Sequence, residues 1–422
     1  MKIKTKDISF EDFINLPIEK RARPLKPSIF FRTLLKIVSA KDIKATHFKV
    51  KEYNMEKLNH KEPALFLMNH SAFIDLEIAS TILYPRPFNI VCTEDGFVGK
   101  NWLLRHLGCI PTKKFVTDYH LFKDMEYVVK EKKSSILMYP EASYSFDGTA
   151  TPLPESLAKC VKLLNIPVVM IRTFGAFQRD PLYNNLQVRD VDVRAEMRFL
   201  LSKDDIESMD LDEINKVING QFEFDNFKWQ IDNNVIVSEP FRADYLHRVL
   251  YKCPHCLTEG ETEGKGTSLV CHHCGAEYFL EENGSIRSVN KETIFNHIPS
   301  WYKWERECVR KELIDGTYKL DIEVDIKAFK GTECLYNIGK GRLIHDVNGF
   351  HLSGCEGKPD VKVSPKAQYS LYSDYYWYEI GDMIAISDKE VTYYCFPTHN
   401  ENVAANTRLA VEELSKIVKG KE

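Results

Sequence analysis

Residues 64–82 read ALFLMNHSAFIDLEIASTI, a short apolar run followed by a polar turn and an amphipathic stretch. Continuous apolar runs of this length are typical of buried strands, and apolar residues three or four positions apart are typical of helices. The alternation continues to about residue 175, with further apolar runs at FNIVC (88–92), SSILM (134–138) and PVVMIR (167–172). Because strands that alternate with helices form largely parallel sheets, the sequence predicts an α/β layer with flanking helices.

The composition is that of an ordinary globular protein. Of 422 residues, 44% are hydrophobic and 28% are charged, and the formal net charge is −4. This balance lacks the positive field with which nucleic-acid binders attract phosphate. No uncharged apolar run approaches the roughly 18 residues of a membrane span, and the opening MKIKTKDISFEDF lacks the apolar centre of a signal peptide. We therefore expect a cytoplasmic protein whose cysteines are thiols or metal ligands.

His70 and Asp75 lie where the first predicted strand turns into its helix. Residues five apart share no face of a helix and point to opposite sides of a strand, so this pair can cooperate only across a turn. A strand ending near Met68 and a helix starting near Phe73 would place His70 at the carboxyl edge of the sheet, where open α/β folds bind ligands. The imidazole could then take a proton from a hydroxyl while Asp75 fixes its tautomer. The spacing alone also fits a helix-capping histidine and a surface aspartate.

Three further segments follow in order: GCIPTKK (108–114), YPEASYS (139–145) and IPVV (166–169). Together with HSAFID (70–75), they resemble the four ordered blocks of the glycerolipid acyltransferase superfamily, typified by 1-acylglycerol-3-phosphate acyltransferases. The resemblance covers about residues 45–245. It implies transfer of an acyl group from acyl-CoA or acyl carrier protein to a lipid or glycerol hydroxyl.

The resemblance also assigns roles to single residues. It implies that His70 is the general base and that Asp75 orients it. Glu141 and Ser145 match the third block, which is implicated in binding the acceptor, and Pro167 matches the fourth block, so all three are expected at the substrate site.

Two blocks depart from the family pattern. The second block commonly ends in an arginine placed to hold a phosphate, whereas this chain has Lys114 next to Lys113. Lysine binds phosphate as a point charge rather than as a bidentate fork. In the third block, Ala142 replaces a glycine and Tyr144 replaces an arginine. We expect both lysines near the acceptor's headgroup and 1-acylglycerol-3-phosphate as the acceptor; alternatively, they are solvated charges at a strand end.

Residues 20–51 carry ten basic side chains, the first of them Lys20, and a single acidic one. Within this range Ser28 can cap a helix with one broad apolar face and with Arg32 and Lys36 opposite. The apolar positions are Ile29, Phe30, Phe31, Leu34, Leu35, Ile37 and Val38. Basic amphipathic helices lie in the membrane interface, so the segment predicts a peripheral contact with a membrane surface. A helix packed on its own domain is the alternative.

Two Cys-x2-Cys pairs, separated by fourteen residues, form the most specific motif. The four positions are Cys253, Cys256, Cys271 and Cys274. This pattern is typical of a zinc ribbon, and four thiolates leave no open position for water, so a structural Zn²⁺ is expected. The competing ligands nearby are His255, His272 and His273. A nucleic-acid-binding ribbon is disfavoured because residues 253–285 hold six glutamates and one lysine.

Aromatic and β-branched residues alternate with Gly and Asp turns from about 317 to 397, which is typical of strands, and a helix is expected near the end of the chain. We therefore predict four parts. They are a basic amphipathic segment (1–45), an acyltransferase domain (46–248), a zinc ribbon (249–285) and a mostly β domain with a terminal helix (286–422).

The predicted function is O-acyl transfer to a lysophospholipid hydroxyl, in phospholipid synthesis or remodelling. No Gly-x-Ser-x-Gly elbow occurs, so direct transfer is favoured over an acyl-serine intermediate. The alternative is a zinc-bearing, membrane-associated scaffold or lipid-binding protein that has lost acyl transfer. The intact pair of His70 and Asp75 favours the enzyme.

Overall fold

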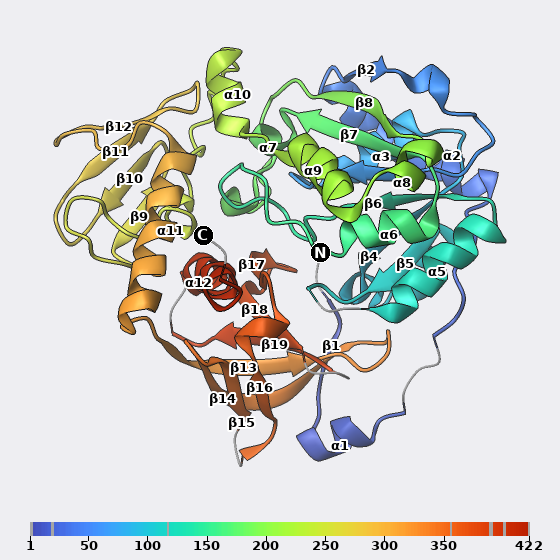
Figure 1. The fold of residues 1–422 in the computed structure, drawn as a ribbon. Coiled ribbons are helices and arrows are strands. Elements are labelled where there is room, and N and C mark those ends of the chain that lie inside the picture. Colours follow the sequence, from blue (N-terminus) through green and yellow to red (C-terminus); the bar gives the residue numbers. More distant parts are fainter. Residues whose placement is uncertain are drawn as a thin grey trace.

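The computed structural model describes residues 3–17, 21–115, 118–354, 357–387, 391–399 and 402–420. Its strands form a seven-stranded sheet, a four-stranded sheet and an eight-stranded sheet (Figure 1). We call the first sheet with its helices the α/β unit, the second the ribbon, and the third, with the helix that ends the chain, the C-terminal unit. The mixed α/β architecture agrees with the fold class expected from the sequence.

The sheet of the α/β unit has the strand order β2-β8-β7-β3-β6-β4-β5. The five strands from β7 to β5 run parallel, whereas β8 and β2 run in the opposite direction. The strands are β2 (Lys49–Tyr53), β3 (Leu65–Met68), β4 (Phe88–Thr93), β5 (Cys109–Thr112), β6 (Ser135–Met138), β7 (Val168–Phe174) and β8 (Arg194–Leu201). The carboxyl ends of β3, β4, β5 and β6 therefore meet at one edge of the sheet.

Helices cover both faces of this sheet because the central strand β3 is apolar on both sides. Leu65 and Leu67 belong to one buried cluster and Phe66 and Met68 to the other, as expected for side chains that alternate along a strand. The helices are α2 (Ile29–Ala45), α3 (Asp75–Ile82), α4 (Asn101–His106), α5 (Tyr119–Lys130), α6 (Leu157–Leu164), α7 (Ala176–Arg179), α8 (Lys203–Ser208), α9 (Leu211–Phe222) and α10 (Asn226–Asp232).

The ribbon is an antiparallel meander that packs against a long helix, α11. Its strands are β9 (Thr262–Lys265), β10 (Ser268–Cys271), β11 (Glu277–Leu280) and β12 (Ile286–Ser288), and α11 covers Ile298–Asp315. Trp301 of α11 donates its indole N–H to the carbonyl of Lys252 at 3.0 Å and meets the ring of Tyr278 edge-on. Helix α11 lies in the range 286–422 that was predicted to be mostly β, so the sequence pattern did not predict it.

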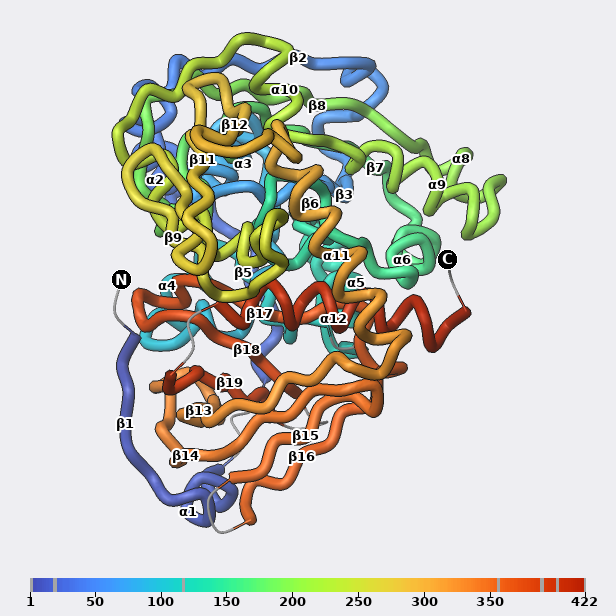
Figure 2. Tube along the Cα trace, turned by 90° about the vertical axis from the view of Figure 1, so that its left-hand side faces the viewer, coloured from blue at the N-terminus to red at the C-terminus, as the bar shows by residue number. Residues whose placement is uncertain are grey.

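The C-terminal unit is an eight-stranded sheet crossed by the helix α12 (Figure 1). Its strands are β1 (Thr5–Asp7), β13 (Leu320–Ala328), β14 (Leu335–Asp346), β15 (Gly349–Gly354), β16 (Asp360–Val363), β17 (Tyr372–Trp377), β18 (Gly381–Ser387) and β19 (Thr392–Pro397), and α12 covers Val403–Val418. The chain after β1 forms the short helix α1 (Phe10–Asn15). In Figure 2, α12 lies between the α/β unit and this sheet, and β1 runs down from the N-terminal end toward α1, along the edge of the sheet where it pairs with β14.

The C-terminal unit docks onto the carboxyl edge of the α/β sheet. After β4, the carboxylate of Asp95 accepts hydrogen bonds from the hydroxyl of Tyr372 at 2.8 Å and from the indole N–H of Trp377 at 3.1 Å. Around this buried contact, Val98 and Phe115 of the α/β unit join the aromatic residues of the other sheet in one apolar cluster. These tyrosines and tryptophans therefore pack between two units.

Helix α2 forms and is capped by Ser28, but Arg32 and Lys36 contact the protein, whereas Lys41 and Lys44 are exposed. The guanidinium of Arg32 donates to the carbonyl of Pro85, and the ammonium of Lys36 lies 4.3 Å from the centre of the Tyr84 ring. The outward positions are apolar and include Ile29, Phe30, Leu34, Ile37 and Val38. Lys20, the first basic residue of the predicted segment, lies outside the described residues.

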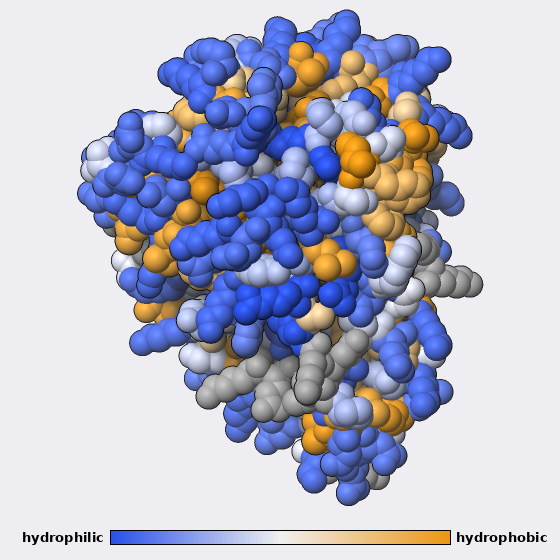
Figure 3. Space-filling model, turned by 90° about the vertical axis from the view of Figure 1, so that its right-hand side faces the viewer, coloured by the Kyte–Doolittle hydropathy of each residue, from blue (hydrophilic) through white to orange (hydrophobic). Residues whose placement is uncertain are grey.

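The apolar outer face of α2 adjoins the exposed Trp102 of α4, whose ring meets that of Phe31 edge-on. Figure 3 shows hydrophobic side chains gathered on part of this side of the molecule. Among the described residues, none of the helices combines the length and the apolar character that crossing a bilayer requires.

Candidate active site

The turn between β3 and α3 brings His70 and Asp75 together. Strand β3 ends at Met68, as expected, and α3 begins at Asp75, two residues later than expected. The imidazole Nδ1 of His70 lies 3.3 Å from the carboxylate Oδ2 of Asp75. The sequence-based prediction that the two side chains meet across this turn agrees with the geometry.

Asp75 is held in place by the backbone of the same turn. Its Oδ2 accepts hydrogen bonds from the N–H groups of Ser71 at 2.7 Å and of Ala72 at 3.0 Å, and its side chain is fully buried. On the other side, the hydroxyl of Thr173 donates to Oδ1 at 3.4 Å. Because Oδ2 of Asp75 acts as an acceptor toward these N–H groups, it acts as an acceptor toward the imidazole as well. Nδ1 of His70 therefore carries the proton, and Nε2 keeps a free lone pair.

The imidazole of His70 is packed against two tyrosine rings. Tyr139 stacks on it with a centroid distance of 4.3 Å, and Tyr144 lies at 4.3 Å in a tilted arrangement. Burial lowers the pKa of His70 below 6.5, and the positive charge of Lys114 lowers it further, while the hydrogen bond and charge of Asp75 oppose this shift. The imidazole is therefore neutral at pH 7, the state in which it can accept a proton.

Glu141, in the third block, binds the backbone of the turn that carries His70. One carboxylate oxygen accepts the N–H of His70 and the other accepts the N–H of Thr151, each at 2.9 Å. Burial raises its pKa to about 7, and the two backbone hydrogen bonds oppose this rise. Ser145 also faces its own loop: its hydroxyl donates to the carbonyl of Thr149 at 2.6 Å, and its N–H donates to the carbonyl of His70 at 3.1 Å. Both residues thus fix the position of the His70 backbone.

Ala142 stands where the family has glycine and adopts a left-handed backbone, with φ of 59°. This conformation costs an alanine about 1–2 kcal/mol because Cβ approaches the neighbouring carbonyl. The turn is closed by the N–H of Ala142, which donates to the carbonyl of Tyr139 at 3.0 Å. The turn therefore closes with an alanine at this left-handed position.

Lys113 and Lys114 follow β5 at the same edge of the sheet. They line a small pocket between the α/β unit and the C-terminal unit, together with Tyr372 and Tyr394. The ammonium of Lys114 lies 3.9 Å from the centre of the Tyr372 ring, and burial lowers its pKa. Among the described residues, no carboxylate lies within ion-pair distance of Lys114; the negative charges that act on it are those of Asp95 and Asp374, which oppose the fall of its pKa.

Pro167 is the predicted site residue that the fold does not bring to this edge. It is buried just before β7, where its carbonyl accepts the N–H of Leu65 at 2.9 Å. Because β3 and β7 run parallel, this contact lies at their amino ends, at the opposite end of β3 from His70.

A family model described as Acyltransferase matches residues 49–173. The match agrees with the acyltransferase-like part predicted from the sequence, and we call these residues the acyltransferase region. They include His70, Asp75, Lys114 and Glu141. Among solved structures, the 1-acyl-sn-glycerophosphate (LPA) acyltransferase PlsC from Thermotoga maritima matches with a TM-score of 0.37 and 12% sequence identity, covering 45% of this chain and 78% of that chain. No curated protein gives a significant match. The acceptor, the donor and the boundary at residue 248 stay predictions.

The four predicted zinc ligands meet at one end of the ribbon, outside the acyltransferase region. The sulfur atoms of Cys253, Cys256, Cys271 and Cys274 all lie within 4.8 Å of one another. Two of the sulfur pairs are 3.7 Å apart, close to the roughly 3.8 Å edge of a tetrahedron with Zn–S bonds of about 2.3 Å. The donor set thus fits Zn²⁺. The imidazole of His272 binds Glu263 instead, at 2.8 Å.

Sequence reasoning missed the residues that the C-terminal unit brings to the acyltransferase region. They are Tyr372, Asp374 and Arg408, which lie more than 190 residues beyond its last matched residue. One signal was present: Arg408 and Glu412 are four residues apart, the spacing at which oppositely charged side chains of one helix pair. Their guanidinium and carboxylate are 3.2 Å apart.

Proposed function

We propose that the protein transfers a fatty acyl group from acyl-CoA or acyl carrier protein to the hydroxyl of a lysophospholipid, most favourably 1-acylglycerol-3-phosphate. The observation that carries this proposal is the hydrogen-bonded pair of His70 and Asp75 at the carboxyl edge of a sheet within residues 49–173. Lys114 supports a phosphate-bearing acceptor because it supplies a half-buried positive charge beside this pair.

In this mechanism Nε2 of His70 takes the proton of the acceptor hydroxyl. The alkoxide attacks the carbonyl carbon of the thioester, the C–S bond breaks, and the thiolate leaves and takes up the proton from the imidazolium. Asp75 stabilises the imidazolium while it exists, since its carboxylate faces Nδ1. Glu141 keeps the His70 backbone in place, so it acts as a positioning residue.

We further propose that the outer face of α2 contacts a membrane surface. An exposed apolar helix face with basic residues at its flanks is the type of surface that inserts into the headgroup region. The side chains of Ile37 and Val38 are 65% and 67% exposed. The contact would therefore be mainly apolar, with anionic lipid attracted by the exposed Lys41 and Lys44.

The test is product analysis with purified full-length protein. Mass spectrometry would follow acyl-CoA or acyl carrier protein donors with glycerol 3-phosphate, lysophosphatidic acid, lysophosphatidylglycerol, lysophosphatidylcholine and monoacylglycerol as acceptors. His70→Ala should lower kcat by about 10²–10⁴-fold, the usual contribution of a general base. His47→Ala is the matched control, because His47 also pairs with an aspartate, Asp192 at 2.8 Å, but both side chains are 72% exposed.

Acylation of a lysophospholipid that disappears in His70→Ala and persists in His47→Ala supports the proposal. Equal rates in His70→Ala and the parent would remove His70 from the mechanism. Acylation of none of the acceptors would favour the scaffold function.

A further inference from the structure

Arg408 is a buried cation with most of its donors unused. It lies on α12, is 2% exposed, and pairs through Nε with one oxygen of Glu412 at 3.2 Å. Its Nη1 and Nη2 are buried and have no hydrogen-bond partner among the described residues. A guanidinium normally uses its fork of N–H groups to bind an oxyanion, and leaving charged donors unsatisfied is costly.

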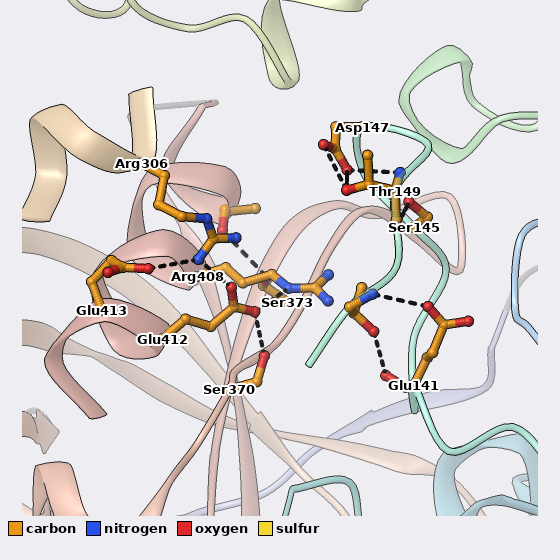
Figure 4. A network of polar contacts seen from close by, with 12 residues as sticks. Glu141, Ser145, Asp147, Thr149, Arg306, Ser370, Ser373, Arg408, Glu412 and Glu413 are labelled. Carbon is orange, nitrogen blue, oxygen red and sulfur yellow. Dashed lines mark hydrogen bonds and ion pairs between the residues drawn. The ribbon is translucent and has the colours of Figure 1, made fainter. Parts of the chain in front are cut away.

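The free end of Arg408 points toward the catalytic turn. Figure 4 shows the side chain reaching from α12 toward the segment that carries Glu141 and Ser145. The guanidinium lies 4.4 Å from the centre of the Phe146 ring, and the preceding residue, Ser145, donates its N–H to the carbonyl of His70. The fork therefore points toward the loop whose backbone contacts that of His70.

Several cationic side chains share the two carboxylates of α12, and on its other side Arg408 acts on Glu141. Arg306 and Arg408 share the carboxylate of Glu412, and Glu413 is shared by further cations. The cations that pair with Glu413 are Arg306, Arg310 and Lys416. Four cationic side chains thus share two carboxylates. On the far side, the positive charge of Arg408 also acts on Lys114, which has no ion-pair partner of its own among the described residues.

We infer that Arg408 and Lys114 together hold the phosphate group of the acceptor, with the guanidinium fork binding two of its oxygens. The inference rests on the proposed function and adds a binding residue from outside the acyltransferase region. Phosphate fits because its oxygens can accept the free N–H groups on Nη1 and Nη2 of Arg408, and its negative charge would face the ammonium of Lys114, which has no ion-pair partner among the described residues. The C-terminal unit would then complete the acceptor site.

The experiment compares Arg408→Gln with Arg310→Gln in the full-length protein. Arg310 also pairs with a carboxylate of α12, but its side chain is 32% exposed and bound to Glu413. We expect Arg408→Gln to raise the KM for lysophosphatidic acid about 10- to 100-fold, the value of losing a charged hydrogen bond, with a much smaller change in kcat. The KM for monoacylglycerol and for the acyl donor should not change, and Arg310→Gln should behave as the parent.

The acyl donor carries phosphate as well as the acceptor. The substrate whose KM increases in Arg408→Gln is therefore the one whose phosphate Arg408 binds. An increase confined to the donor's KM, or no increase at all, would overturn the assignment. Arg408→Gln removes one partner of Glu412, which could destabilise the fold. Two further variants avoid this: the double variant Arg408→Gln with Glu412→Gln, and Arg408→Lys, which keeps the charge. Arg408→Lys should recover part of the affinity if charge matters and less than all of it if the fork matters.

Titration calorimetry with glycerol 3-phosphate separates this inference from the proposed function. Binding that is lost in Arg408→Gln would support the phosphate site even if no acyl transfer were detected. Acyl transfer with binding and acceptor KM unaffected by Arg408→Gln would refute the phosphate site and leave the acyltransferase function standing.

Discussion

Replacing Asp75 by asparagine isolates the electrostatic role of the pair with His70. The amide fits the site: its oxygen can accept the N–H groups of Ser71 and Ala72 that Oδ2 now accepts, and its NH₂ can face the hydroxyl oxygen of Thr173 near Oδ1. Fold and stability should therefore change little. What disappears is one negative charge at 3.3 Å from Nδ1 of His70.

The size of the effect follows from that distance. At an effective dielectric constant of about 20, a charge at this distance stabilises the imidazolium of the transition state by about 5 kcal/mol. Because His70 is neutral in the ground state, the loss appears in the rate, and kcat should fall about 10³- to 10⁴-fold. Asp75 also raises the pKa of His70 against burial, so the pKa falls further in the variant. The acidic limb of its residual activity should move to lower pH.

The assay is steady-state kinetics over a pH range, with thermal melting as the check on folding. Asp192→Asn is the control, since Asp192 pairs with the exposed His47. A kcat for Asp75→Asn equal to that of the parent, or an acidic limb that moves to higher pH, would refute the role assigned to the pair.

Three further predictions concern the ribbon, α2 and Glu141. Purified protein should contain one Zn²⁺ per chain by elemental analysis. Cys271→Ser should lower both the zinc content and the melting temperature, because metal binding at the four cysteines contributes folding energy. Zinc-free protein with all four thiols open to alkylation would contradict this prediction. The double variant Ile37→Glu with Val38→Glu should weaken sedimentation with anionic vesicles without lowering turnover of a soluble acceptor. The control Ile314→Glu, at a residue of α11 that is also 65% exposed, should leave sedimentation unchanged. Unchanged sedimentation of the double variant would exclude α2 from the membrane contact. Burial raises the pKa of Glu141 to about 7, above its value in the unfolded chain. The free energy of unfolding, measured by urea titration, should therefore fall as pH rises from about 5 to 8, and it should fall less in Glu141→Gln. Equal pH dependence in the variant and the parent would exclude this contribution.

The local chemistry of the site could be predicted from the sequence because it depends on neighbours in the chain. The strand, the turn and the helix from Leu65 to Ile82 follow from hydrophobic pattern, and the His70–Asp75 contact follows from the turn. The four cysteines come together for the same reason, since each Cys-x2-Cys pair is closed by its own backbone turn.

Orientation and long-range contacts could not be predicted in this way. Periodicity gives α2 two faces but does not say which one is turned inward; the carbonyl of Pro85 and the ring of Tyr84 decide that by binding Arg32 and Lys36. Likewise, nothing near Arg408 in the sequence indicates that its helix lies beside the acyltransferase region. That placement depends on packing of the whole C-terminal unit, including the contact of Tyr372 with Asp95.

Strand β1 has a consequence for the order in which the chain folds during synthesis. Thr5 pairs with Leu335 in parallel register, so the segment that leaves the ribosome early finds its partner only after β14 has been made. The α/β unit can fold in the meantime, because its strands are contributed by consecutive segments. Closing a loop of this length costs only slightly more entropy than closing a shorter one, but it delays the pairing. Until then β1 has no partner strand, so the last sheet is completed only when segments from opposite parts of the chain meet.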